Sequence, residues 1–212
     1  MEHEATDDLD SFDTLLMRYS QEPRGGEREA IAARIWARFG AKLSVLVVDM
    51  SGFTRISRSH GIVHYLSLIH RLQRSAAPII QSYAGQVVKF EADNIFARFP
   101  APQHAIQAAI ALHLAMDAEN LLTPDELDIR LACGIDHGDC LLPDDHDYFG
   151  TAVNRASKLG EDVGTPGTIL VTDEAMALVP DNASLARTRL VVDIGGDRTP
   201  VWSVDYRDAI DA

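Results

Sequence analysis

Positive charge and cysteine are both scarce in this 212-residue sequence. Its 19 lysines and arginines are outnumbered by 32 aspartates and glutamates, so the formal net charge is −13. Because duplex nucleic acid and anionic membranes bind positively charged surfaces, this balance excludes both as expected partners. The two cysteines, Cys133 and Cys140, have neither CxxC nor zinc-type spacing. We therefore expect reduced, buried thiols in a cytoplasmic protein.

Long apolar runs are also missing. The apolar stretch at the start of the predicted core covers only 43–48, whereas a membrane-spanning helix needs about 20 residues. No positively charged segment precedes an apolar stretch at the N-terminus, so neither a secretory signal nor an integral membrane segment is expected. A hydrophobic content of 46% and a charged content of 24% are typical of a soluble globular domain.

The first 40 residues differ from the rest. Seven acidic residues and one arginine occupy the first 22 positions, and proline and glycine then interrupt the chain. Apolar residues recur every four positions between 27 and 39, which predicts a helix. We therefore predict an acidic appendage with one helix at 1–40, and a single domain at 41–212.

Strands and helices are mixed in this domain without strict alternation. A break at Gly138 favours a hairpin there, and another hairpin turn is expected at 91–94. The pattern predicts an α+β fold with a largely antiparallel sheet and helices on one face. Strands are expected at 43–48, 85–90, 95–99, 127–135, 139–142 and 168–171, with a final pair within 190–205, and helices at 65–83, 102–119 and 151–159.

Two aspartates follow or join predicted strands. Asp49 closes the apolar stretch 43–48, which is costly unless the carboxylate is capped, paired or bound to metal. Asp93 lies at the tip of a predicted hairpin. An N-cap for Asp49 and an Asx-turn for Asp93 are the simpler interpretations. If the hairpin lies beside the first strand, the carboxylates converge, and a divalent cation would relieve their repulsion.

Four separated segments resemble the catalytic domain of class III nucleotidyl cyclases. They are VVDMSGFT at 47–54, GQVVKFEAD at 85–93 followed by IFARF, CGIDHG at 133–138, and DYFGTAVNRASK at 147–158. The resemblance covers about residues 42–206, with the segments in the family's order. It implies a ferredoxin-like βαββαβ core and a head-to-tail dimer whose sites combine residues of both chains. Because all the matching positions occur on this one chain, a homodimer is implied.

The resemblance also implies roles for individual residues. Asp49, Met50 and Asp93 would form the site for Mg²⁺ or Mn²⁺. Lys89 and Asp147 would recognise adenine, and Asn154 would orient the ribose. Adenine offers an acceptor at N1 and a donor at its amino group, so a lysine and an aspartate favour ATP and refuse guanine. The remaining nucleotide-binding positions would be Ser51, Gly52, Phe53, Thr54 and Val153, of which 51–54 lead into a helix N-terminus.

The cations that would bind phosphate depart from the family pattern. Lys158 stands where the family has an arginine, so its charge remains but the planar group that binds two oxygens is lost. Ile194 replaces a phosphate-binding lysine of many members, and Ala132 replaces an arginine, although Arg130 lies two positions earlier. Ala92 replaces the glycine before the second metal aspartate, which makes that turn stiffer.

These departures lead to a specific hypothesis. The sequence predicts an ATP-binding protein of cyclase fold whose cyclase activity is weak or lost. The alternative is an active adenylate cyclase that converts ATP to cyclic AMP and pyrophosphate by a two-metal mechanism. Asn154 and Lys158 would then be its catalytic residues, with Arg130 or Arg198 in place of the missing cations. A purely structural dimerisation domain is a third interpretation.

Overall fold

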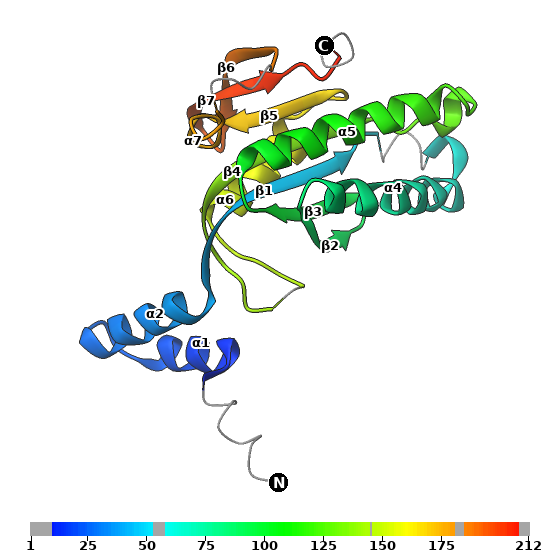
Figure 1. Cartoon of the computed structure of the whole chain (residues 1–212). Coiled ribbons are helices and arrows are strands. Elements are labelled where there is room, and N and C mark those ends of the chain that lie inside the picture. The colour runs from blue at the N-terminus through cyan, green and yellow to red at the C-terminus, as the bar shows by residue number, and fades with distance from the viewer. Residues whose placement is uncertain (1–9, 53–57, 145, 181–184, 208–212) are drawn as a thin grey trace.

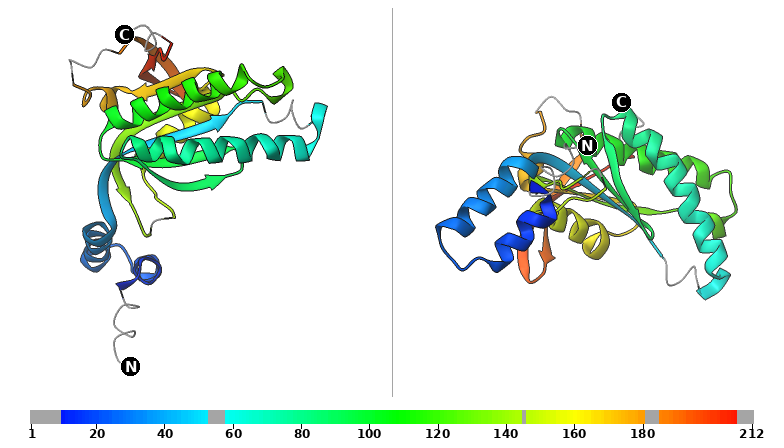
Figure 2. Two further views of the ribbon diagram at one scale, coloured as in Figure 1. Left: turned by 45° about the vertical axis from the view of Figure 1, so that its right-hand side comes forward. Right: turned by 90° about the horizontal axis from the view of Figure 1, so that it is seen from below.

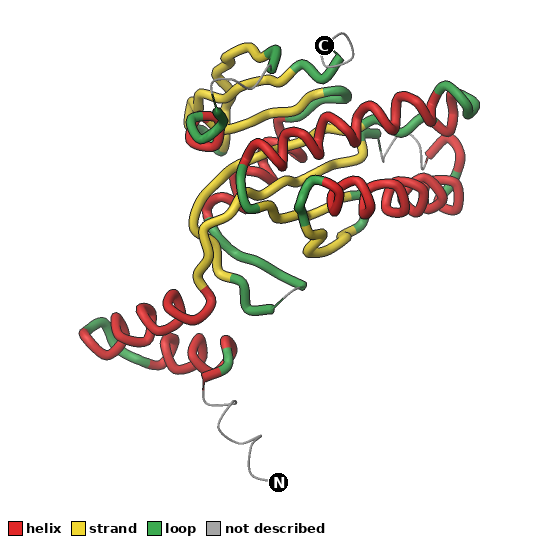
Figure 3. The backbone as a smooth tube through the Cα atoms, viewed as in Figure 1, coloured by secondary structure: helices red, strands yellow, loops and turns green. Residues whose placement is uncertain are grey.

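A single seven-stranded sheet forms the body of the described structure (Figures 1 and 3). The computed structural model describes residues 10–52, 58–144, 146–180 and 185–207. The strand order is β2-β3-β1-β4-β5-β7-β6, and all neighbours pair antiparallel except β4 and β5. The largely antiparallel sheet predicted from the sequence is therefore confirmed. The strands are β1 Gly40–Met50, β2 Gln86–Glu91, β3 Asn94–Phe99, β4 Leu131–Leu141, β5 Thr168–Thr172, β6 Arg187–Ile194 and β7 Asp197–Val204.

Helices lie on both faces of this sheet (Figure 2). The two long helices, α4 and α5, cover one face, and the shorter α6 and η3 pack on the other, so the expectation that all helices share one face is wrong for α6 and η3. Alternate residues of β1 explain the arrangement: Leu46 and Val48 join the core under α4 and α5, whereas Val45 and Val47 join the core under α6. The helices are α1 Phe12–Gln21, α2 Gly26–Phe39, α4 Ile62–Ser82, α5 Pro102–Asn120, η2 Asp125–Leu127, α6 Thr151–Ser157, η3 Lys158–Val163 and α7 Asp173–Met176.

Strand β4 corrects one expectation. The hairpin predicted about Gly138 is wrong, because β4 continues through this residue and pairs with β1 along its whole length. Gly138 stands opposite Leu43 in that ladder. A Cβ added to Gly138 would lie 3.3 Å from the Cβ of Ala152 on α6. The glycine therefore lets the helix approach the strand and does not form a turn.

Another glycine of β4 brings the helical backbone still closer. A Cβ added to Gly134 would lie 2.0 Å from the carbonyl oxygen of Ala156 and 2.5 Å from the amide nitrogen of Gly160. No side chain fits in that space, so α6 and η3 rest directly on the strand. This packing fixes the segment that carries Val153, Asn154 and Lys158 relative to the sheet.

The N-terminal appendage is a helical hairpin that extends away from the sheet (Figures 1 and 2). The sequence predicts one helix in this appendage, which is α2, and α1 is a second helix that was not predicted. Ser11 caps α1 by accepting a hydrogen bond from the Thr14 amide at 3.2 Å. Leu15 of α1 packs with Ile31 and Ile35 of α2 in a small apolar core, against which Leu141 at the end of β4 also packs.

None of the described helices is long and apolar enough to cross a membrane.

Candidate nucleotide and metal site

The two predicted metal aspartates come to the same end of the sheet. Asp49 is the penultimate residue of β1, and the β1–β3 ladder places it opposite Asn94. Asp93 immediately precedes Asn94 in the turn between β2 and β3. Burial, followed by the charges of Asp93 and Glu161, raises the pKa of Asp49 from 3.8 to about 6. The antiparallel pairing therefore brings the carboxylates together at a position where negative charge is poorly tolerated.

Glu161 is an acidic neighbour that the sequence analysis did not identify. It lies on η3, and its pKa is raised by burial and then by Asp162, with smaller effects from Glu91 and Asp93. The hydroxyl of Tyr65, on α4, faces the same carboxylates: burial, Asp93 and Asp49 raise its pKa. Only the packing of η3 on β4 brings Glu161 to this end of the sheet, and no local motif indicates it.

These residues fit a divalent cation. Mg²⁺ prefers one or two carboxylates together with phosphate oxygens and water, and Asp49 with Asp93 supplies two carboxylates whose repulsion a cation would relieve. Met50 is 1% exposed with its side chain in the core, so only its main chain is available to a metal. Within the described ranges, no group of three or more His, Cys, Asp or Glu side chains forms a metal site unaided. Oxygens from a nucleotide would therefore have to complete the coordination.

The predicted phosphate turn follows β1. The Ser51 amide donates a hydrogen bond to the Arg130 carbonyl oxygen at 2.9 Å, which ties the turn to the start of β4. Gly52 has φ +101°, a conformation that favours glycine. Both residues line a cavity of about 650 Å³ that His60 and Arg130 also border. Phe53 and Thr54 lie outside the described residues.

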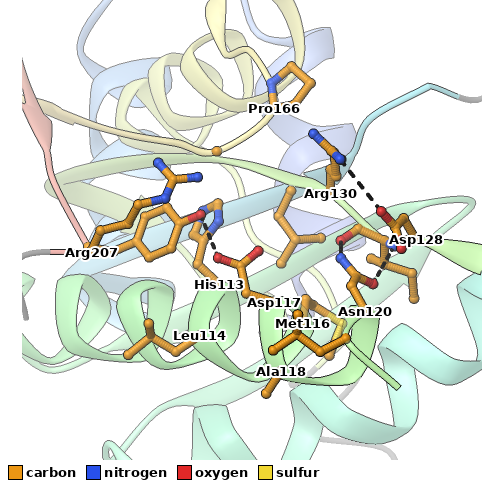
Figure 4. A pocket seen from close by; sticks show the side chains of 15 residues that line it. His113, Leu114, Met116, Asp117, Ala118, Asn120, Asp128, Arg130, Pro166 and Arg207 are labelled. Atoms are coloured by element: carbon orange, nitrogen blue, oxygen red, sulfur yellow. Dashed lines mark hydrogen bonds and ion pairs between the residues drawn. The ribbon is translucent and has the colours of Figure 1, made fainter. Parts of the chain in front are cut away.

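A separate cavity of about 480 Å³ lies between α5, the start of β4 and the C-terminal end of β7 (Figure 4). Arg130 borders both cavities. Much of the polar lining is already bonded internally: the Tyr206 hydroxyl donates to Asp117 at 2.9 Å, and the Asn120 side chain bonds both main-chain groups of Ile129 at 2.9 Å. Apart from Arg130, none of the predicted site residues lines this cavity.

The predicted base-recognition pair is in contact. Lys89 Nζ, on β2, lies 3.2 Å from Asp147 Oδ1, in the loop before α6. The ammonium also lies 5.1 Å from the centre of the Phe96 ring and 3.1 Å from Glu91 Oε2, a contact that the sequence analysis missed. Burial lowers the pKa of Lys89, but hydrogen bonds to Glu91 and Asp147 outweigh it and raise the pKa overall. The lysine is therefore a fixed cation between two carboxylates.

Helix α6 carries Val153 and Asn154, and Lys158 is the first residue of η3. Asn154 is exposed, whereas Val153 is half-buried against the core under α6. Lys158 Nζ reaches the turn between β6 and β7, where it lies 3.2 Å from the position of a Cβ added to Gly195. Ile194, at the position of the family's lysine, packs partly buried against an apolar cluster of η3, β5 and β7. Lys158 thus places its charge next to the position where that cation is missing.

The other two candidate cations, Arg130 and Arg198, are both exposed. Arg130, just before β4, is 66% exposed and forms a 3.5 Å ion pair with Asp128. Arg198 is exposed on β7, opposite Asp193 in the β6–β7 ladder. Ala132 is fully buried and stands opposite Asp49 in the β1–β4 ladder.

A buried ion pair holds α6 in place, and sequence reasoning missed it. Arg155 donates to both carboxylate oxygens of Asp136, at 2.7 and 3.0 Å, and to Glu174 of α7 at 2.9 Å. Asp136 is fully buried within β4, whereas the sequence pattern placed it in a turn. Thr172 also donates to this carboxylate. The residue beside Asn154 therefore anchors α6 to two other elements.

Comparison with known proteins identifies the domain. Residues 38–202 match the family described as "Adenylate and Guanylate cyclase catalytic domain". The chain is 30% identical over 131 residues to "Putative adenylate cyclase 3" of Rhizobium meliloti (strain 1021), and the match covers 61% of the chain and 22% of that much longer protein.

Solved structures of cyclases have the same fold. The adenylate/guanylate cyclase/hydrolase from Silicibacter pomeroyi is 30% identical, with a TM-score of 0.65 over 78% of this chain and 97% of the other. The adenylyl cyclase CyaB from P. aeruginosa is 22% identical, with a TM-score of 0.67 over 78% of this chain and 94% of the other. The chain therefore belongs to the adenylate and guanylate cyclase catalytic domain family.

Proposed function

We propose that this protein binds ATP with a divalent metal ion at the interface of a homodimer, and that its cyclase activity is weak or lost. The observation that carries the ATP assignment is the 3.2 Å contact between Lys89 and Asp147. These residues lie on different elements, 58 positions apart (147 − 89), and they supply the donor and the acceptor that the adenine edge requires.

We expect two chains to be needed to complete one site, because the family resemblance implies metal residues from one chain and base-recognition residues from the other. A head-to-tail homodimer would join the metal half of one protomer to the base half of its partner, as the family resemblance implies.

Within such a site the chain's own groups have distinct tasks. Lys89 and Asp147 would hold the base, Asn154 would orient the ribose, and Lys158 would meet negative charge on the phosphates. The metal ions, when bound, would neutralise charge on the attacking and departing oxygens.

The phosphate contacts are where activity would be lost. Donors placed for developing charge are worth about a hundredfold or more in rate each. Lys158 provides one ammonium where the family has a guanidinium that binds two oxygens, and Ile194 provides no donor at all. Metal and base contacts do not depend on these two positions, so we expect binding to be affected less than turnover.

A specific observation favours the alternative of an active adenylate cyclase. Lys158 Nζ lies beside Gly195, next to the position of the missing lysine, so one side chain could partly serve both roles. Under this alternative, ATP is converted to cyclic AMP and pyrophosphate at an appreciable rate.

One pair of measurements separates these functions. ATP binding is measured by calorimetry with Mg²⁺ or Mn²⁺, and cyclic AMP formation is assayed on the same preparation. Tight binding with little product supports the binding protein, whereas turnover comparable with ordinary cyclases supports the enzyme. The double variant Lys158→Arg with Ile194→Lys should raise turnover at similar ATP affinity. If Asp49→Ala with Asp93→Ala leaves metal-dependent ATP affinity unchanged, neither function holds and a structural dimerisation domain is favoured.

A further inference from the structure

The cavity of about 480 Å³ beside α5 combines an apolar floor with charged groups that the proposed function does not use (Figure 4). Its floor includes Met116, Ile129 and Leu131, which are each 1% exposed and belong to the main core. Among the described residues, Arg130 is the only predicted member of the nucleotide site that borders it. A ligand in this cavity would therefore bind separately from a nucleotide.

A negative and a positive charge border this cavity, and both contact Tyr206. The Asp117 carboxylate, on α5, accepts a hydrogen bond from the Tyr206 hydroxyl at 2.9 Å. The Arg207 guanidinium lies over the tyrosine ring, with its Cζ 4.7 Å from the ring centre. Burial and then Asp117 raise the pKa of Tyr206, whereas Arg207 acts in the opposite direction. One buried tyrosine thus lies in contact with both charges.

Neither of these charges is neutralised by an ion pair. Within the described ranges, Asp117 and Arg207 form no ion pair with each other or with any other side chain, and both residues are exposed to a ligand. His113 adds no charge, because burial lowers its pKa to about 4. The other arginine of the lining, Arg130, is already paired with Asp128 at 3.5 Å. The cavity therefore offers one carboxylate and one guanidinium to a ligand.

The position of Asp117 does not favour its own helix. Asp117 lies in the last turn of α5, which contains no basic residue. The C-terminal end of a helix carries partial negative charge, so a carboxylate is unfavourable there. A charge at this point lowers helix stability, and contact with a cationic group would offset that loss.

We propose that this cavity binds a free α-amino acid with an aliphatic side chain. The ammonium of the ligand donates to Asp117, its carboxylate accepts from Arg207, and its side chain covers the apolar floor at Leu131. An α-amino acid carries both charges on one carbon atom, so it can bridge two side chains that form no ion pair with each other. Both bonds are charge-assisted, which makes them stronger than bonds between neutral groups.

Ligands with a single charge fit this cavity less well. An anion bound to Arg207 is repelled by Asp117, and an amine bound to Asp117 is repelled by Arg207. A zwitterion satisfies both groups and brings no net charge into the cavity. The volume of about 480 Å³ lies within the range of small-molecule sites, which usually combine an apolar wall with a few placed polar groups.

Calorimetric titration of the full chain with L-leucine, without nucleotide, tests this inference. We expect a dissociation constant below about 1 mM. Leucinamide keeps only the positive charge and N-acetyl-leucine keeps only the negative one, so each should bind at least about tenfold more weakly. The inference is wrong if L-leucine, L-valine and L-methionine all fail to bind. It is also wrong if either singly charged analogue binds as tightly as leucine, since the cavity would then be a simple cation or anion site.

Variants test the two contacts separately. Asp117→Asn and Arg207→Gln should each weaken leucine binding by about tenfold, whereas Arg207→Lys keeps the charge and should retain most of the affinity. Asparagine can still accept the hydrogen bond from Tyr206, so the fold should be preserved. Arg74→Gln, at an exposed position on α4, is the matched control and should change nothing. If Asp117→Asn and Arg207→Gln bind leucine as the wild type does, the assignment fails, whatever the ATP affinity of the same preparation.

Discussion

Replacing Asp49 by asparagine should make the metal-free protein more stable. The Asp49 carboxylate is partly buried and close to the charges of Asp93 and Glu161, which together raise its pKa from 3.8 to about 6. When the pKa of a carboxyl group is higher in the folded state, ionising the group costs more free energy there than in the unfolded chain. Its charge therefore destabilises the fold. Asparagine has nearly the same shape and removes that charge, so the destabilisation should disappear.

The magnitude follows from the pKa. Each pKa unit corresponds to about 1.4 kcal/mol, so a rise from 3.8 to about 6 corresponds to about 3 kcal/mol at pH 7.5. Solvent screening of a partly exposed group reduces this, and we expect Asp49→Asn to stabilise the metal-free fold by about 1–2 kcal/mol. The direction of this pKa shift also sets how stability depends on pH. Because the folded state of the wild type binds more protons between pH 4 and 6, its stability should fall as the pH rises through this window.

Urea unfolding of both proteins in chelator, from pH 4 to pH 8, measures these differences. The wild type should lose stability across the window and regain it when Mg²⁺ or Mn²⁺ is added, whereas Asp49→Asn should show neither effect. Asp197→Asn, at an exposed position on β7, controls for the change in net charge. The reasoning is refuted if Asp49→Asn is less stable than the wild type in chelator, or if metal stabilises both proteins equally.

Three further predictions concern stability and packing, and urea unfolding measures each. Ala92→Gly should stabilise the fold by about 0.5 kcal/mol, because Ala92 has φ +52°. Ala84→Gly, at φ +59°, should stabilise the fold by a similar amount. Of the two, only Ala92→Gly should change the metal affinity. Arg155→Ala should cost about 3–5 kcal/mol because it leaves a fully buried carboxylate unpaired, whereas Arg130→Ala breaks an exposed pair and should cost less than about 1 kcal/mol. Gly134→Ala should cost about 3 kcal/mol or more and weaken nucleotide binding, since its Cβ would lie 2.0 Å from a main-chain oxygen of α6. These assignments would be contradicted if the two arginine variants lost equal amounts of stability, or if Gly134→Ala were as stable as the wild type.

The elements that could be predicted from the sequence are those with a clear periodic pattern. The apolar stretch 43–48 lies in β1 because it is buried on both faces, and the hairpin about 91–94 was correct because a polar turn separates two apolar segments. Helix α1 has a similar signal, with Phe12, Leu15 and Tyr19 in the hairpin's apolar cluster, but its many acidic neighbours concealed it.

The parts that could not be predicted depend on close packing between distant segments. Gly138 was interpreted as a turn because its sequence gives no sign that Ala152 lies against it. The pairing of Asp136 with Arg155 likewise requires α6 to lie across β4. Contacts made by packing between distant segments do not follow any fixed spacing in the sequence. Glu161 comes close to the metal carboxylates through the same kind of packing.

Because the net charge is −13, the cations near the proposed site that form no ion pair bear directly on catalysis. Most cations around the proposed site are neutralised within the chain: Lys89 contacts two carboxylates, Arg155 contacts two others, and Arg130 contacts Asp128. In the part of the chain that the structure describes, neither Lys158 nor Arg198 forms an ion pair, and the Lys158 ammonium lies beside the β6–β7 turn. In a strongly acidic protein, an unpaired cation attracts a polyphosphate more strongly than a cation already paired with a carboxylate. Whether one ammonium suffices for turnover is therefore decided by Lys158→Met, which should abolish any cyclic AMP formation while the base contacts still bind ATP.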